Sequence, residues 1–110
     1  AVIDLGEWWE SDTGLPIPLG AILARHGLPA AELAKVVRDS VEYAWAHPAA
    51  SRSFVAAHAA EMSAQVQAQH IALYVNEFTR DLGEEGYAAA QALLARAHAA
   101  GLSPPVPPLR

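Results

Sequence analysis

Apolar residues form short β-favouring runs near the start of the chain, separated by a stretch of mixed character. The runs Val2–Leu5 and Ala21–Arg25 are each long enough for one strand, and the second is predicted to be largely buried. Between them, Glu7–Thr13 is predicted to make one or two helical turns that stop at Gly14. The prolines of Leu15–Gly20 remove backbone donors and favour extended geometry, so this run is not helical.

From Ala30 onward the apolar residues recur at helical spacing, which predicts four helices. The first has its apolar residues on one stripe, with most charged residues opposite: Leu33, Val36, Val37, Val41, Ala44 and Trp45. A second helix is predicted from Pro48 to about Met62. A third begins after the capping residue Ser63 and is expected to be the most buried. A fourth starts with a capping-box-like pattern at Asp81 and stops at Gly101.

These patterns divide the chain into three parts. Residues 1–29 hold the strands and a Pro-rich crossover, residues 30–102 the helices, and residues 103–110 an extended Pro-rich tail. Two short strands this far apart make a poor sheet, and each unpaired buried amide costs about 1–3 kcal/mol. We therefore expect the rest of the sheet to lie outside these 110 residues. The start, which has no Met and no basic leader, also suggests a fragment.

Composition narrows the classes of partner. Charged residues make up 17% of the chain, below the ~25% usual for a free-standing domain. The net charge is −5 and no basic patch is visible, which argues against nucleic acid. No apolar run approaches the roughly 18 residues of a membrane span. The absence of cysteine excludes disulfides, thiolate metal sites and cysteine nucleophiles.

The five histidines are the first candidates for chemistry: His26, His47, His58, His70 and His98. A helical metal pair needs a spacing of three or four residues, and no two of them have it, so no metal site is predicted. His58 and His70 lie on apolar stripes and are interpreted as core or boundary residues. His47 fits a helix terminus, and His98 lies in a last helical turn, where a cation is favourable.

Acidic and aromatic residues cluster before the Pro-rich run. Glu7, Glu10 and Asp12 could serve acid/base chemistry if their surroundings separated their pKa values, but a solvated helix face explains the same spacing. Trp8 and Trp9 would point about 100° apart on a helix, so one is predicted in the core and the other at a lobe or subunit boundary. Stacking on a ligand is the alternative for this pair.

The run Thr13–Gly20 is the most distinctive of the chain. It lacks the glycine spacing and the lysine of a phosphate-binding loop. A rigid connector into a strand accounts for most of its features, and a wall of a cleft is the functional alternative. Trp9 and Pro18 are therefore the candidates for substrate contact.

Several motifs occur in order along nearly the whole chain except its tail: Asp4–Trp9, Thr13–Ile22, Ser40–Ala44 with His47–Pro48, Tyr74–Thr79 and Asp81–Gly86. Together they resemble the family of 1,4-dihydroxy-6-naphthoate synthases, which act in the futalosine route to menaquinone. The resemblance implies the C-terminal part of a two-lobed α/β fold like that of type II periplasmic binding proteins. The part seen here would be mostly α-helical, with two short strands.

The same resemblance implies an activity. The family is a cytoplasmic lyase type that converts the small molecule cyclic dehypoxanthine futalosine to 1,4-dihydroxy-6-naphthoate without metal or organic cofactor. Its proton-abstracting histidine precedes the Asp4–Trp9 motif, so the base is expected upstream of Ala1. No residue of this chain is assigned a catalytic role, and the chain alone is predicted to be inactive. A homo-oligomer is left open.

Three other interpretations remain at this stage. The chain could be the C-terminal part of a solute-binding protein, or of the related chorismate dehydratase, which also carries a Thr-Gly-Leu-Pro run. The Leu15–Gly20 continuation and the Trp8–Trp9 pair favour the naphthoate synthase. The third is a self-contained helical interaction domain in which the two strands form a local hairpin.

Overall fold

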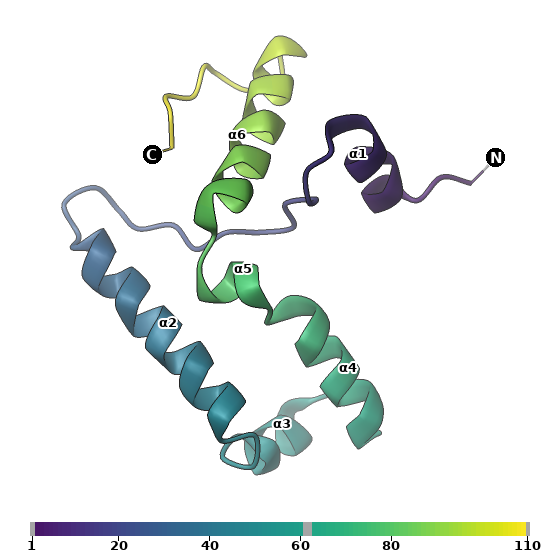
Figure 1. Ribbon diagram of the computed structural model, residues 1–110, viewed down its shortest axis with the longest axis vertical. Helices are drawn as coiled ribbons and strands as arrows, with labels where there is room; N and C mark the ends of the chain where they lie inside the picture. Colours follow the sequence, from purple (N-terminus) through teal and green to yellow (C-terminus); the bar gives the residue numbers. More distant parts are fainter. Residues whose placement is uncertain (1, 61–62, 110) are drawn as a thin grey trace. The chain divides into compact units, whose positions relative to one another are not determined.

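The computed structural model describes residues 2–60 and 63–109, and within these ranges the chain is helical with no strand (Figure 1). Its helices are α1 (Leu5–Thr13), α2 (Ala30–Ala46), α3 (Arg52–His58), α4 (Ala64–Tyr74), α5 (Glu77–Arg80) and α6 (Gly83–Ala99). They belong to two compact units. Unit 1 joins the residues up to Leu23 with those from Leu82 onward, and unit 2 is Ala24–Asp81.

Local capping determines both ends of α1. The Asp4 side chain accepts hydrogen bonds from the backbone N–H groups of Gly6 at 2.8 Å and Glu7 at 3.0 Å, which starts the helix. At the other end Gly14 adopts a left-handed conformation, with φ of 68°, and its N–H bonds the Glu10 carbonyl at 2.9 Å. The predicted stop at Gly14 is therefore confirmed.

The prediction of two strands is wrong for this chain. At Val2–Leu5, the Asp4 side chain caps a helix that already includes Leu5, while Val2 is fully exposed. At Ala21–Arg25 the backbone is irregular, and Ile22 and Leu23 are 77% and 89% exposed. A strand is held by hydrogen bonds to a neighbour. Among the residues that the structure describes, this segment has no strand beside it.

α6 begins at Gly83, within the Asp81–Glu84 stretch where its start is predicted. The N-cap position of α6 is Leu82, whose side chain makes no capping hydrogen bond, and Asp81 just before it binds Arg38. Glu84 and Glu85 do lie in the first turn, at the positive end of the helix dipole.

The end of α6 follows the sequence closely. Gly101 is left-handed, with φ of 73°, and donates its N–H to the His98 carbonyl at 2.9 Å. The Leu102 N–H bonds the Ala97 carbonyl at 2.9 Å, which completes a Schellman motif. The Pro-rich tail then continues without regular structure, and the Leu109 N–H bonds the Gln91 side chain at 3.0 Å.

In unit 2, α2 packs against α5. The predicted apolar stripe of α2 is divided: Val41 is buried, whereas Leu33, Val36 and Trp45 are exposed. Arg38 and Glu42, predicted on the solvent side, instead carry ion pairs to Asp81 and Arg80. These ion pairs lie on the side of α2 that faces α5. α5 is short and mostly polar, so it offers little apolar surface against which α2 could pack.

The second predicted helix is shorter than expected. A turn closed by the Ala50 N–H on the His47 carbonyl at 2.9 Å precedes α3, which runs only from Arg52 to His58. Ala59 is already extended, and the predicted end at Met62 lies outside the described residues.

The prediction that the third helix is the most buried is wrong. Ser63 caps α4 as predicted, through its hydroxyl and the Val66 N–H at 3.5 Å, but no described residue of α4 is buried. The helix ends at Tyr74 because Asn76 starts a new one. The Asn76 side chain accepts from the Phe78 N–H at 2.9 Å.

The core is thin. Within residues 2–60 and 63–109, the buried apolar residues are Trp9, Val41 and Ala89, while many large apolar side chains are exposed. A stable domain of this length usually buries about 65% of its unfolded surface.

Within residues 2–60 and 63–109, no helix has the length and apolar character needed to cross a membrane.

Candidate functional site

Trp9 is the centre of the best-defined cluster in unit 1. Its side chain is 4% exposed, and its indole N–H donates to the Pro16 carbonyl oxygen at 3.1 Å. Thr13, one turn later on α1, donates its hydroxyl to the Trp9 carbonyl at 2.8 Å. The same hydroxyl accepts from the Leu15 N–H at 3.1 Å. The Trp9–Pro16 and Thr13–Leu15 hydrogen bonds hold the Pro-rich loop against α1.

Arg96 of α6 completes this cluster from the far end of the sequence. Its guanidinium carbon lies 5.2 Å from the centre of the Trp9 ring, within the range of a cation–π contact. One of its nitrogens lies 2.6 Å from the Asp12 carboxylate. Trp9, Thr13, Pro16, Asp12 and Arg96 are called the Trp9 clasp below. The clasp joins α1, the loop and α6 into one unit.

The two predicted substrate contacts differ in their surroundings. The Trp9 side chain is packed within the clasp, and in this structure other residues of the protein cover its ring. Pro18 is half-buried and borders neither of the two hollows described below. Their contact with substrate stays a prediction. One residue of the tryptophan pair is in the core, as predicted: it is Trp9, whereas Trp8 is 47% exposed.

A shallow hollow of about 310 Å³ lies beside Trp8. It is lined by Val2, Ile3, Asp4, Glu7, Trp8 and Ser11. Asp4 already caps α1, and Asp12, the third acid of this region, is bound to Arg96. Asp4 and Asp12 therefore have structural partners, and the hollow is a wide surface depression beside an aromatic ring.

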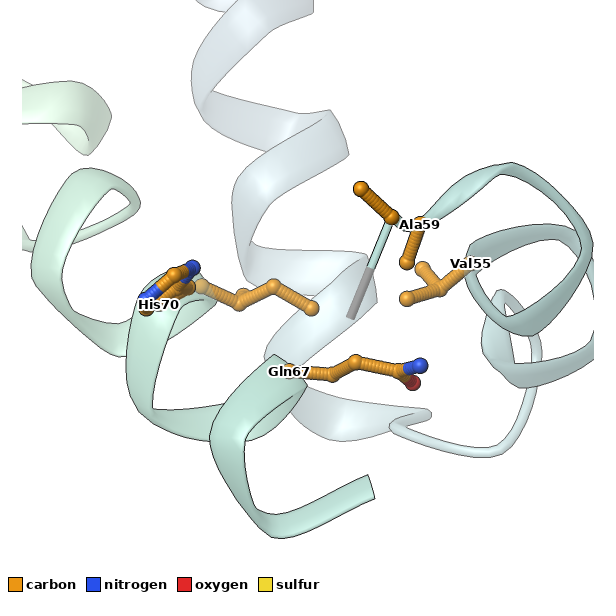
Figure 2. Close-up of a pocket in the computed structure, with 6 residues that line it drawn as sticks. Val55, Ala59, Gln67 and His70 are labelled. Carbon is orange, nitrogen blue, oxygen red and sulfur yellow. The ribbon is translucent and has the colours of Figure 1, made fainter. Parts of the chain in front are cut away.

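A second hollow, of about 270 Å³, lies between α3 and α4 in unit 2 (Figure 2). It is lined by Val55, Ala59, Ala60, Gln67, His70 and Ile71. His70 was predicted in the core or at its boundary, and it is exposed at this largely apolar hollow. The sequence alone did not reveal the hollow, because it depends on how α3 and α4 meet.

Three histidines make local contacts with the backbone. The His47 Nδ1 donates to the Tyr43 carbonyl at 3.0 Å, and the His58 Nδ1 donates to the Phe54 carbonyl at 2.8 Å. Each ring also stacks on the aromatic ring four residues earlier, with 4.1 Å between centroids. His98 bonds the Ser103 carbonyl at 2.9 Å. These three histidines therefore make local contacts at the C-terminal ends of α2, α3 and α6.

In the described parts of the chain, no three His, Asp or Glu side chains come together as a metal site would require.

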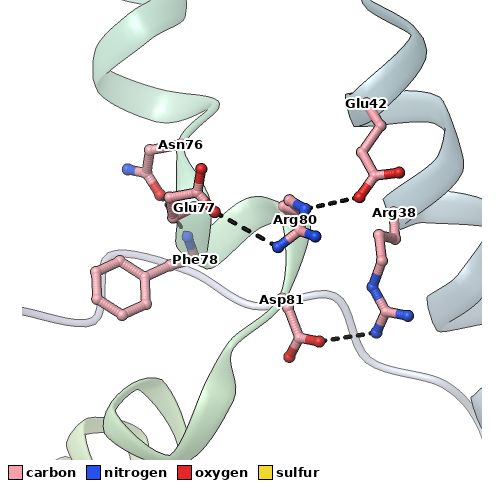
Figure 3. A network of polar contacts seen from close by, with 7 residues as sticks. All are labelled: Arg38, Glu42, Asn76, Glu77, Phe78, Arg80 and Asp81. Carbon is pink, nitrogen blue, oxygen red and sulfur yellow. Dashed lines mark hydrogen bonds and ion pairs between the residues drawn. The ribbon is translucent and has the colours of Figure 1, made fainter. Parts of the chain in front are cut away.

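Ion pairs join α2 to the last residue of α5, Arg80, and to Asp81, which follows it (Figure 3). The Arg80 Nε lies 2.7 Å from the Glu42 carboxylate, and the Arg38 Nη2 lies 2.8 Å from Asp81. The hydrogen bond and the charge of Glu42 raise the pKa of Arg80, against a small lowering by desolvation, and Glu77 adds to the rise. A guanidinium held in its charged form is suited to binding an anion or stabilising structure, and it is a poor proton donor.

The comparisons with known proteins agree with one another. A family described as "Menaquinone biosynthesis" matches residues 1–99. A 1,4-dihydroxy-6-naphthoate synthase of Streptomyces coelicolor is 59% identical over 108 residues, which is 96% of this chain and 38% of that protein. One of Thermus thermophilus is 50% identical over 109 residues, 96% of this chain and 40% of that protein. The chain thus spans about two fifths of the length of these curated relatives.

Proposed function

Because the chain belongs to the menaquinone biosynthesis family, we propose that it is part of a 1,4-dihydroxy-6-naphthoate synthase. The observation that carries this proposal is 59% and 50% identity to two such synthases over 96% of the chain. The resemblance predicted from the motifs is thereby confirmed. The tail from Ala100 onward lies outside the family match.

The proposed reaction converts cyclic dehypoxanthine futalosine to 1,4-dihydroxy-6-naphthoate, as a lyase of the cytoplasm acting on a small molecule. In this proposal the proton-abstracting histidine lies in a part of the enzyme that this chain does not contain. The local engagement of His47, His58 and His98 at helix ends supports that assignment. The chain contributes structure around the site, and no catalytic residue.

For the fold, we propose the C-terminal part of a two-lobed α/β enzyme. Residues 1–29 would return the chain to the first lobe, residues 30–102 would cover the lobes, and residues 103–110 would form a tail. The thin core and the exposed apolar side chains support this arrangement, because the missing contacts of one part are supplied by the rest.

A chimera tests the proposed function. The segment of the Thermus thermophilus synthase that matches this chain is replaced by residues 1–110, and the product is measured by chromatography. We expect turnover of cyclic dehypoxanthine futalosine within about tenfold of the parent enzyme, which is about 1.4 kcal/mol of activation free energy. The 110-residue chain alone is the matched control and should form no product.

Circular dichroism and a melting curve accompany each assay. A chimera that melts cooperatively but forms no 1,4-dihydroxy-6-naphthoate would overturn the proposed function. Product formed by the isolated chain would overturn the placement of the catalytic base outside it.

A further inference from the structure

α2 presents different side chains on two nearly opposite faces. At about 100° per residue, Arg38, Val41 and Glu42 lie on one side of the helix, and this side packs against α5. The other side carries Leu33, Val36, Ser40 and Tyr43. We call these four residues the outer stripe.

The outer stripe is apolar and open to solvent. Leu33, Val36 and Tyr43 are 42%, 64% and 60% exposed. Ser40, between them, is exposed and small, so a partner can approach the helix closely at its middle. These positions follow the i, i+3, i+7, i+10 spacing of a helix that lies in an apolar groove.

Two features around the stripe fit an interface. The Tyr43 ring is stacked on His47, so its position is already fixed and less side-chain freedom would be lost on docking. Along one border, Lys35 pairs with Asp39, and both remain exposed. An apolar centre with a polar rim is the usual anatomy of a protein interface.

The occupant follows from the length of the relatives. This chain matches only 38% and 40% of two synthases to which it is at least 50% identical. We propose that the outer stripe docks into an apolar groove formed by the part of the synthase polypeptide that this chain lacks. The inference rests on the proposed function. A second copy is less suited, because a stable dimer buries about 800 Å² per partner and the stripe is one narrow helix face.

Cysteine labelling tests the proposal, since the chain has no cysteine of its own. Val36→Cys places a thiol on the outer stripe. Lys35→Cys places one on the neighbouring side of α2, where the side chain is 69% exposed. Both variants are made in the isolated chain and in the chimera, and alkylation of the α2 peptide is followed by mass spectrometry.

In the isolated chain we expect both thiols to react at similar rates. In the chimera, Val36→Cys should react at least about tenfold more slowly, which corresponds to about 1.4 kcal/mol, and Lys35→Cys should be unchanged. Equal rates for Val36→Cys in the two proteins would overturn the inference. So would protection in the isolated chain that grows with its concentration, because that result identifies a second copy as the occupant.

Measuring the activity of the chimera distinguishes failure of the proposed function from failure of the proposed interface. An active chimera with a fast-reacting Val36→Cys would overturn the interface and leave the proposed function standing. An inactive, folded chimera with a protected Val36→Cys would overturn the proposed function and support the interface.

Discussion

The Trp9 clasp of unit 1 and the α2–α5 contact of unit 2 are held by different forces. In the clasp a buried indole is fixed by a directional hydrogen bond and covered by Arg96. Between α2 and α5, the Arg80–Glu42 and Arg38–Asp81 ion pairs stand at the surface, with Val41 buried beside them. Burial of an aromatic ring stabilises a unit much more than exposed ion pairs do. Unit 1 should therefore resist perturbation better.

The strongest test of this comparison is Trp9→Ala. Removing a buried aromatic side chain costs about 3–5 kcal/mol, through lost burial and the cavity left behind. We expect a chimera with this substitution to lose that much stability in urea unfolding. Trp8→Ala is the matched control, and its loss should be much smaller because Trp8 is 47% exposed. Equal losses would contradict the central place of Trp9.

Gly14→Ala tests the turn that leads into the clasp. Gly14 has φ of 68°, and an alanine in this left-handed conformation costs about 1–2 kcal/mol. A Cβ at this position meets no atom, so the loss comes from the backbone alone. The urea midpoint should fall by the corresponding amount. Gly20→Ala, which also meets no atom and has no left-handed φ, is the control and should change the midpoint little.

Asp12→Asn separates the ion pair of the clasp from its aromatic contact. Asp12 and Arg96 are each 47% exposed, so the loss should be at most about 1 kcal/mol. Arg96→Met removes the ion pair and the cation over Trp9 together, and should cost more than Asp12→Asn. If the two substitutions cost the same, the contact with the ring contributes nothing.

The α2–α5 contact should respond to salt and pH in a defined way. Screening at 1 M salt shortens the Debye length to about 3 Å, so the Arg80–Glu42 pair weakens there while the burial of the Trp9 ring is little changed. Because Glu42 raises the pKa of Arg80, the stabilisation is present below the unfolded pKa and is lost only as the pH rises through the still higher folded value. NMR of the guanidinium carbon should therefore show Arg80 losing its charge at a higher pH than it does in a Glu42→Gln variant. Arg80→Gln should reduce the salt response, and the Arg38–Asp81 pair should account for the remainder.

Helix ends were the part of the fold that could be predicted best. Gly14, Ser63 and Gly101 act on backbone groups within a few residues, so the local sequence determines their role. The run Ala21–Arg25 has equally clear strand chemistry, but a strand needs a neighbour. The residues that could provide one are not in the described chain.

The site was predictable only in part for the same reason. The sequence indicated that one residue of the Trp8–Trp9 pair is buried, but not which one. The buried ring, Trp9, is covered by Arg96, which lies 84 residues beyond Asp12. The α3–α4 hollow likewise depends on contacts between helices. Substrate contact by Trp9 and Pro18 remains a prediction.

The separation of Asp12 from Arg96 also has a consequence for synthesis on the ribosome. The two partners are 84 residues apart, and translation adds about 5–20 residues per second. The Trp9 ring therefore waits about 4–17 s before α6 emerges to cover it. During that interval the Trp9 side chain is exposed, and transiently exposed apolar surface favours chaperone binding and aggregation. The order in which the ribosome delivers the helices thus determines when unit 1 can first close.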